Sequence, residues 1–135
     1  MRALRLLPLV LALAACDTLR VLPPEGAVRA DGFSLTADRP SYDNRDEVTL
    51  TLRNDGPERG EMGVLACAAL EQRTDDGWTQ DLAHNDRACI MLLVYVEPGS
   101  EQAAVVELEG VPDGTYRFTH RVSGVEVATA SFEVR

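Results

Sequence analysis

An unbroken alternation of apolar and polar residues occurs in Glu47-Val-Thr-Leu-Thr-Leu-Arg53. In an extended chain, Val48, Leu50 and Leu52 point to one face, and the threonines and charged residues point to the other. This pattern is typical of a strand with one buried face. The segment ends at Asn54-Asp-Gly-Pro57, whose residue types favour a turn.

Similar short segments lie on both sides of this strand and are separated by residues that favour turns. Asp75-Asp-Gly77, for example, is a hairpin signal. No window shows a helical period. We expect strands at residues 33–37, 47–53, 64–73, 78–80, 88–96, 102–108, 115–122 and 125–134. Seven to eight strands at regular spacing predict an all-β fold, a single antiparallel β-sandwich at residues 32–135.

The first fifteen residues have the layout of a signal peptide. Arg2 and Arg5 precede the uncharged residues 6–15, a run shorter than the roughly 20 apolar residues of a membrane-spanning helix. Leu13-Ala14-Ala15-Cys16 resembles the lipobox of bacterial lipoproteins. The resemblance implies diacylglycerol on the Cys16 sulfur, cleavage before Cys16 and an acylated N-terminus. The alternative is a buried N-terminal helix that carries a chance cysteine.

Lipidation would anchor the protein stably, because several acyl chains hold a membrane where one chain holds it only marginally. We therefore expect a protein of the cell envelope, on the periplasmic face of either the inner or the outer membrane. Residues 16–31 hold Pro23-Pro24 and Gly26 without a sustained period. They are predicted to form a mobile, lipidated tether between the signal peptide, residues 1–15, and the folded domain.

Composition narrows the classes of function. The chain has 135 residues with 13 Arg, no Lys and 22 acidic residues, and its formal net charge is −9. A single domain of this length is expected. Binding of nucleic acid needs a basic surface, so the acidic charge argues against it. Nucleotide binding is not expected either, because the sequence has no glycine-rich loop. Removal of Arg2 and Arg5 with the signal peptide leaves 11 Arg against 22 acidic residues, a charge of −11.

Processing leaves two cysteines for the folded domain, Cys67 and Cys89. Outside the cytoplasm such a pair is expected to form a disulfide. A closed loop of about 20 residues would stabilise the fold by about 3 kcal/mol in the chain-entropy account. Two free thiols are the alternative. A metal site built from only two cysteines has even less support.

Val111-Pro-Asp-Gly-Thr-Tyr-Arg-Phe118 resembles the tyrosine corner of immunoglobulin-like domains. The resemblance implies that Gly114 and Tyr116 form the corner, with the Tyr116 hydroxyl bonded to upstream backbone, and that Phe118 is a core residue. Ser41-Tyr42, followed by the strand from Glu47, is similar to the second strand of bacterial immunoglobulin-like modules.

Glu97-Pro-Gly99, followed by Gly114-Thr-Tyr116, also resembles the layout of BsuPI-type proteinase-inhibitor-like domains. Their inhibitory activity does not carry over, because no reactive loop matches residue by residue. The antibody branch is excluded as well. Its disulfide joins two strands of opposite sheets, whereas Cys67 and Cys89 flank the central hairpin and Trp78 follows the turn of that hairpin.

The sequence contains few candidate catalytic or metal-binding residues. His84 could ligate a metal with Asp81 or Asp86, but no histidine spacing supports this, and a solvated loop histidine is expected. His120 is expected to be a satisfied histidine of the core or of a sheet end. Asp43-Asn-Arg-Asp-Glu47 is expected to be a solvated turn rather than a calcium site. No nucleophile motif occurs, so neither metal, cofactor nor catalytic residue is expected.

These observations favour a lipid-anchored, non-enzymatic interaction or envelope-assembly module. Its partners would be the membrane, through the lipid, and an envelope protein. The binding surface is expected at the loops of one end of the sandwich or at the hairpin around Trp78. Trp78, beside a disulfide-pinned loop, is the candidate interaction anchor, although the same ring could instead cap the core. The alternative function is inhibition of envelope proteases. A third hypothesis, a metal-dependent enzyme at His84, Asp81 and Asp86, has the least support.

Overall fold

A computed structural model describes residues 24–135. Cys16, the predicted signal peptide and residues 16–23 of the predicted tether lie outside the described residues. Within the described range the chain forms strands and two short 3-10 helices, η1 (Leu65–Cys67) and η2 (Ala83–Asp86), with no α-helix. The strands are β1 (Phe33–Ala37), β2 (Ser41–Tyr42), β3 (Glu47–Asn54), β4 (Gly60–Met62), β5 (Ala69–Thr74), β6 (Gly77–Thr79), β7 (Val94–Val96), β8 (Glu101–Glu107), β9 (Gly114–Val122), β10 (Val125–Ala128) and β11 (Phe132–Val134).

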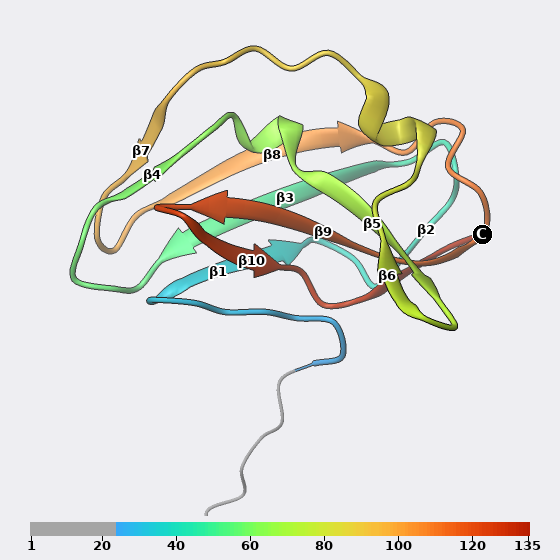
Figure 1. Ribbon diagram of the computed structural model, residues 1–135, viewed down its shortest axis with the longest axis horizontal. Helices are drawn as coiled ribbons and strands as arrows, with labels where there is room; N and C mark the ends of the chain where they lie inside the picture. Colours follow the sequence, from blue (N-terminus) through green and yellow to red (C-terminus); the bar gives the residue numbers. More distant parts are fainter. Residues whose placement is uncertain (1–23) are drawn as a thin grey trace, which may run out of the picture.

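These strands form two sheets around one core (Figure 1). The smaller sheet has the order β1-β3-β8. In the larger sheet the neighbours are β2-β11-β9-β4-β7, with β10 and β5 also paired to β9, and β6 paired to β5. Val48, Leu50 and Leu52 on β3 have no exposed surface, as their alternation predicts. The all-β sandwich expected from the sequence is confirmed.

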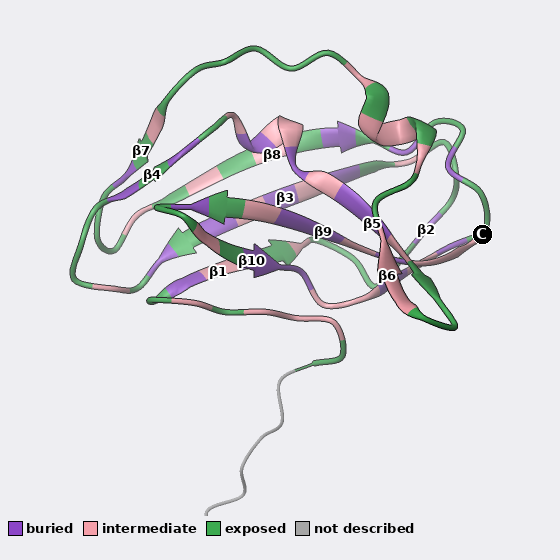
Figure 2. Cartoon of the chain, in the orientation of Figure 1, coloured by how far each residue is buried: buried purple, intermediate pink, exposed green. Residues whose placement is uncertain are grey.

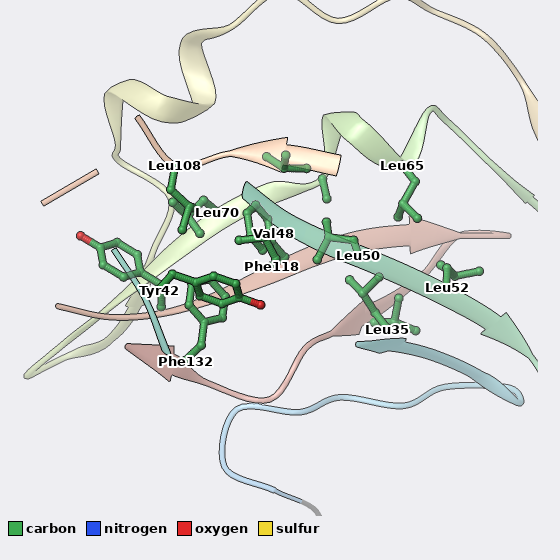
Figure 3. Packing of buried hydrophobic residues seen from close by; sticks show 14 of the residues in the cluster. Leu35, Tyr42, Val48, Leu50, Leu52, Leu65, Leu70, Leu108, Phe118 and Phe132 are labelled. Atoms are coloured by element: carbon green, nitrogen blue, oxygen red, sulfur yellow. The ribbon is translucent and has the colours of Figure 1, made fainter. Parts of the chain in front are cut away.

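Aromatic side chains fill the core at one end of the sandwich (Figure 3). The Phe132 ring lies 5.2 Å from the Tyr42 ring, 5.7 Å from the Phe118 ring and 6.4 Å from the Tyr116 ring, measured between centroids. Aromatic pairs at these separations stabilise a core beyond the area that they bury. The cluster joins β2, β9 and β11, so it fixes the C-terminal strand against the centre of the larger sheet.

The predicted strand at residues 125–134 is two strands, β10 and β11, which pair with successive parts of β9. Ala128 and Phe132 are four residues apart, whereas their partners Thr119 and Tyr116 are three apart, so the chain carries one extra residue between them. Thr129 fills this bulge. Its hydroxyl accepts a hydrogen bond from the Phe118 N–H at 3.0 Å, and its own N–H donates to the Phe118 carbonyl at 2.9 Å.

Three further expectations need correction. The run predicted as a strand from residue 64 contains η1 before β5 begins at Ala69. Only Val94–Val96 of the predicted strand 88–96 forms β7. Continuous apolar runs carry no period, so sequence alone does not separate a strand from a short helix or a loop. The sandwich is also not purely antiparallel, because β2 pairs with β11 in parallel.

Residues 25–30, which the sequence assigned to the predicted tether, contact the folded domain. The Ser131 N–H donates to the Glu25 carbonyl at 2.8 Å. Val28 and Ala128 exchange two backbone hydrogen bonds, at 3.0 and 3.1 Å. The boundary expected at residue 31 therefore lies within an ordered segment, and this segment runs along β10 (Figure 1).

Candidate interaction surface

Trp78, the predicted interaction anchor, lies on β6 and is half-buried. The Arg117 guanidinium lies over its ring, 4.5 Å from the centroid. Arg117 also donates to Glu71 at 2.9 Å and to the Gly26 carbonyl at 2.8 Å. A Cβ added to Gly26 would lie 3.2 Å from the Trp78 ring, so the N-terminal segment passes close to the indole. Much of the Trp78 surface is thus engaged within the molecule, and its role as an anchor for a partner stays a prediction.

The Glu71–Arg117 pair beneath Trp78 is largely shielded from water. The side chains are 10% and 12% exposed, respectively. The guanidinium stacks on the Trp78 ring with its face and donates to the Glu71 carboxylate from its edge, an arrangement for which its planar shape is suited. This group connects β5, β6, β9 and residue 26.

Tyr116 and Gly114 occupy the region predicted as the tyrosine corner. The Tyr116 side chain is buried, and its hydroxyl donates to the Pro112 carbonyl at 2.6 Å. Burial raises the pKa of this hydroxyl, and the Asp113 carboxylate raises it further. A Cβ at Gly114 would lie 3.1 Å from the Gln72 amide nitrogen and 3.3 Å from the Tyr116 ring. The position therefore has little room for a larger residue.

Cys67 and Cys89 form the predicted disulfide, which joins η1 to the loop before Ile90. A second connection lies beside it. Arg87 donates to the carbonyls of Ala66 and Ala68, at 2.7 and 2.9 Å. The disulfide and Arg87 therefore fix the start of this loop to η1 from two directions.

The residues of the hypothetical metal site are not arranged to bind a metal. His84 contacts the Arg87 guanidinium, a cation that opposes a metal ion at the same nitrogen. Burial and the Arg87 charge together lower the pKa of His84 to about 4. Across residues 24–135, no group of three or more His, Cys, Asp or Glu side chains, Asp81 and Asp86 included, could hold a metal ion. The His84 ring, on η2, thus packs against the side chain of Arg87, the residue that follows η2.

His120 lies on β9 at the edge of an apolar cleft. Its Nε2 is 3.2 Å from the Gly63 carbonyl oxygen. Burial lowers the pKa of His120, and the hydrogen bond with Gly63 opposes this shift. The cleft has a volume of about 420 Å³, and its lining includes Val64 and the loop residues 90–93.

The largest exposed apolar surface was not expected from the sequence. Six large apolar side chains are exposed in residues 24–135, and five of them belong to residues 90–95, here called the 90–95 segment. Their exposed fractions are 71% for Ile90, 103% for Met91, 56% for Leu92, 55% for Leu93 and 43% for Tyr95. Figure 2 shows this part of the chain exposed along most of its length. The available signal was a run from residue 88 to 96 without a charged side chain.

Contiguous exposed apolar surface of this kind marks sites of interaction in soluble domains. The 90–95 segment, rather than Trp78, therefore provides the candidate surface with the most unengaged apolar area.

No helix among the described residues is both long and apolar enough to cross a membrane.

Comparisons with known proteins identify the fold family. No curated protein matches this chain. Among solved structures, the Pseudomonas fluorescens alkylpurine DNA glycosylase AlkC, bound to DNA containing an abasic site analog, is 13% identical with a TM-score of 0.42. That match covers 82% of this chain and 32% of the glycosylase, and it is too weak to bear on function. The family described as bacterial Ig-like domain matches residues 29–133. The chain therefore belongs to the bacterial Ig-like domain family.

Proposed function

We propose that this protein is a lipid-anchored module of the cell envelope that acts by binding another macromolecule and catalyses no reaction. Its family is generally non-enzymatic and typically extracellular or envelope-associated. The observation that carries the proposal is the 90–95 segment, an exposed apolar surface on an otherwise acidic domain. The lipobox-like Leu13-Ala14-Ala15-Cys16 supports the anchor.

The structure favours binding over chemistry for a physical reason. The two histidines are held in contacts with Arg87 and with the Gly63 carbonyl, and the lowered pKa of each favours its neutral form. Catalytic sites instead gather titratable groups around a cleft. The cleft beside His120 is lined mainly by aliphatic residues, which suit contact with an apolar partner.

Membrane fractionation with labelled fatty acid tests the anchor. Wild-type chain is expected to sediment with membranes and to carry label, and Cys16→Ser is expected to carry none. Affinity capture from the same membranes then tests binding, with wild type enriching a partner over a tag-only control. A labelled Cys16→Ser chain would overturn the predicted lipidation site. Capture that never exceeds the control, with or without crosslinker, would overturn the interaction role.

A further inference from the structure

The smaller sheet ends in a strand with one unpaired edge. β8 is seven residues long, contains no proline and pairs with β3 alone among the described strands (Figure 1). Hydrogen bonds at both ends fix its register. The Leu108 N–H donates to the Asp46 carbonyl, and the Ser100 carbonyl accepts from the Asn54 N–H, each at 3.0 Å. Residues of an antiparallel strand alternate between those that bond the neighbouring strand and those that point away from it.

This register shows which backbone groups of β8 are free. Because Leu108 and Ser100 bond β3, the even-numbered residues between them do so as well. The N–H and C=O groups of the odd-numbered residues therefore point away from β3, and these exposed residues are Glu101, Ala103, Val105 and Glu107. β8 thus presents a set of strand-pairing groups that no strand of residues 24–135 uses.

A groove of about 640 Å³ adjoins this free edge. Val105, Val106 and Glu107 of β8 line it on one side. Residues of the two 3-10 helices also contribute, among them Ala66 of η1 and Ala83 of η2. The groove provides space for a further extended chain beside the strand, which is the geometry by which sheet edges bind peptides.

The two ends of β8 differ in how their charges are compensated. At one end Glu101 is opposite Arg53 on β3, with 3.7 Å between Oε2 and Nη1. At the other end Glu107 is opposite a second carboxylate, Glu47. Neither of these two glutamates takes part in a salt bridge among residues 24–135, although Arg45 lines the same hollow. Like charges directly opposed across strands are unfavourable, so this end of the edge lacks a cation.

We infer that the free edge of β8 binds an extended segment of another protein, added antiparallel to the smaller sheet with a Lys or Arg opposite Glu107. Directly opposed residues of paired strands share one face and interact, so the basic side chain would lie beside that carboxylate. Val105 and Ala103 follow on the same face. Uncharged residues are therefore expected two and four positions after the basic residue of the segment.

A second copy of this chain fits the edge less well. In the antiparallel register that pairs all of β8 with itself, Glu101 of one copy is opposite Glu107 of the other, which is a further pair of like charges. A basic segment of another protein suits the whole domain, because residues 24–135 carry 21 Asp or Glu and 10 Arg. The inference goes beyond the proposed function, since it concerns the other sheet and does not involve the 90–95 segment.

Binding of a synthetic peptide to the full-length, detergent-solubilised chain tests the inference. The probe is Arg-Thr-Val-Thr-Val-Thr-Ser, acetylated at its N-terminus and labelled with fluorescein at its C-terminus. Its arginine would lie opposite Glu107, and its first valine opposite Val105. Fluorescence anisotropy should show saturable binding with a Kd below about 1 mM. The same peptide with glutamate in place of arginine should bind at least about fivefold more weakly.

Two methylated peptides distinguish strand pairing from charge attraction alone. In the added strand both valines direct their N–H groups toward β8, and the first two threonines direct theirs away. N-methylation of both valines should therefore abolish binding at concentrations at which the unmodified peptide saturates the chain. N-methylation of the two threonines should change the Kd by less than about twofold, because those N–H groups face solvent. Equal affinities of the two methylated peptides would overturn the inference.

Matched variants of the chain test the two ends and the edge itself. Glu107→Gln should weaken binding about fivefold, whereas Glu101→Gln, at the end already paired with Arg53, should change the Kd by less than about twofold. Val105→Pro should abolish binding, because proline has no N–H to offer the added strand. An edge strand accepts proline where the N–H faces solvent, so this variant should remain folded. Thermal unfolding checks all three variants, and the methylated peptides need no variant.

Three further results would overturn the inference. They are no saturable binding of the arginine peptide, equal effects of Glu107→Gln and Glu101→Gln, or a dimer of the full chain that Val105→Pro dissociates, measured by light scattering. The last result would identify a second copy as the occupant of the edge. Any of the three would leave the proposed interaction role standing, because affinity capture tests that role separately.

Discussion

Trp78 and the 90–95 segment are both apolar, yet the fold treats them differently. The Trp78 ring is covered by the Arg117 guanidinium and by the chain at Gly26. Ile90 and Met91 are 71% and 103% exposed. Tryptophan is larger than these side chains and is more common at the centre of interfaces, yet in this fold the aliphatic run is the part exposed to solvent.

This difference shows that exposure depends on what the tertiary structure places opposite a side chain. Trp78 on β6 is two strands away from β9, whose Arg117 reaches over its ring, and it lies beside the docked chain at Gly26. Only Val94 and Tyr95 of the 90–95 segment lie on β7, an edge strand, and residues 90–93 form the loop before it, over which no described element packs. An aromatic residue near a predicted loop is therefore a weaker indicator of a binding surface than a long uncharged apolar run.

The largest effect is expected at the ion pair beneath Trp78. Arg117→Met should lower the free energy of unfolding by about 4 kcal/mol, because it leaves the Glu71 carboxylate buried without its partner. Glu71→Gln combined with Arg117→Met should recover much of this loss. Urea unfolding measures both. As the control, Arg53→Met removes a pair with Asp55 that is about half exposed and should cost less than about 1 kcal/mol.

If Arg117→Met and Arg53→Met had equal effects, the shielding of the Trp78 region would be of no energetic consequence. The contrast with the open 90–95 segment would then rest on geometry alone. A double variant no more stable than Arg117→Met would show that Arg117 acts through its contacts with Trp78 and Gly26, rather than through Glu71.

A smaller effect is expected from the disulfide that fixes the start of the 90–95 segment. Cys67→Ser combined with Cys89→Ser should lower the free energy of unfolding by about 3 kcal/mol, because the unfolded chain regains the freedom of a closed loop with a sequence separation of 22. Hydrogen exchange should rise most at residues 88–93. The Trp78 fluorescence spectrum should not change, because the ring is held by Arg117 and by the chain at Gly26. Uniform exchange throughout the fold would contradict a local role for the bridge.

Local patterns predicted the parts of the fold that local geometry determines. The alternation in β3 placed Val48, Leu50 and Leu52 inside correctly, because a strand has a fixed period of two. The hairpin at Asp75-Asp-Gly77 was predicted correctly, and β5 pairs with β6 around it. The Cys67–Cys89 bond was predicted from two cysteines and from the location outside the cytoplasm that the sequence leads us to expect.

Features set by distant residues could not be predicted in this way. The docking of Val28 depends on Ala128, one hundred residues further along the chain. The division of β10 from β11 depends on a single bulge at Thr129 opposite Phe118. The exposure of Ile90 depends on the absence of a described element packed over the loop at residues 90–93, and a continuous apolar run looks the same whether or not such an element is present.

The smallest effect gives the most direct test of the comparison, through one substitution in each region. Trp78→Ala should cost about 1–2 kcal/mol of stability, because it removes partly buried area and the stacked cation. Leu92→Ser should change stability by no more than about 0.5 kcal/mol, because that side chain is 56% exposed. Thermal unfolding at a concentration that keeps the chain monomeric measures both. Had the indole been the open surface and the aliphatic run part of the core, the two values would be reversed.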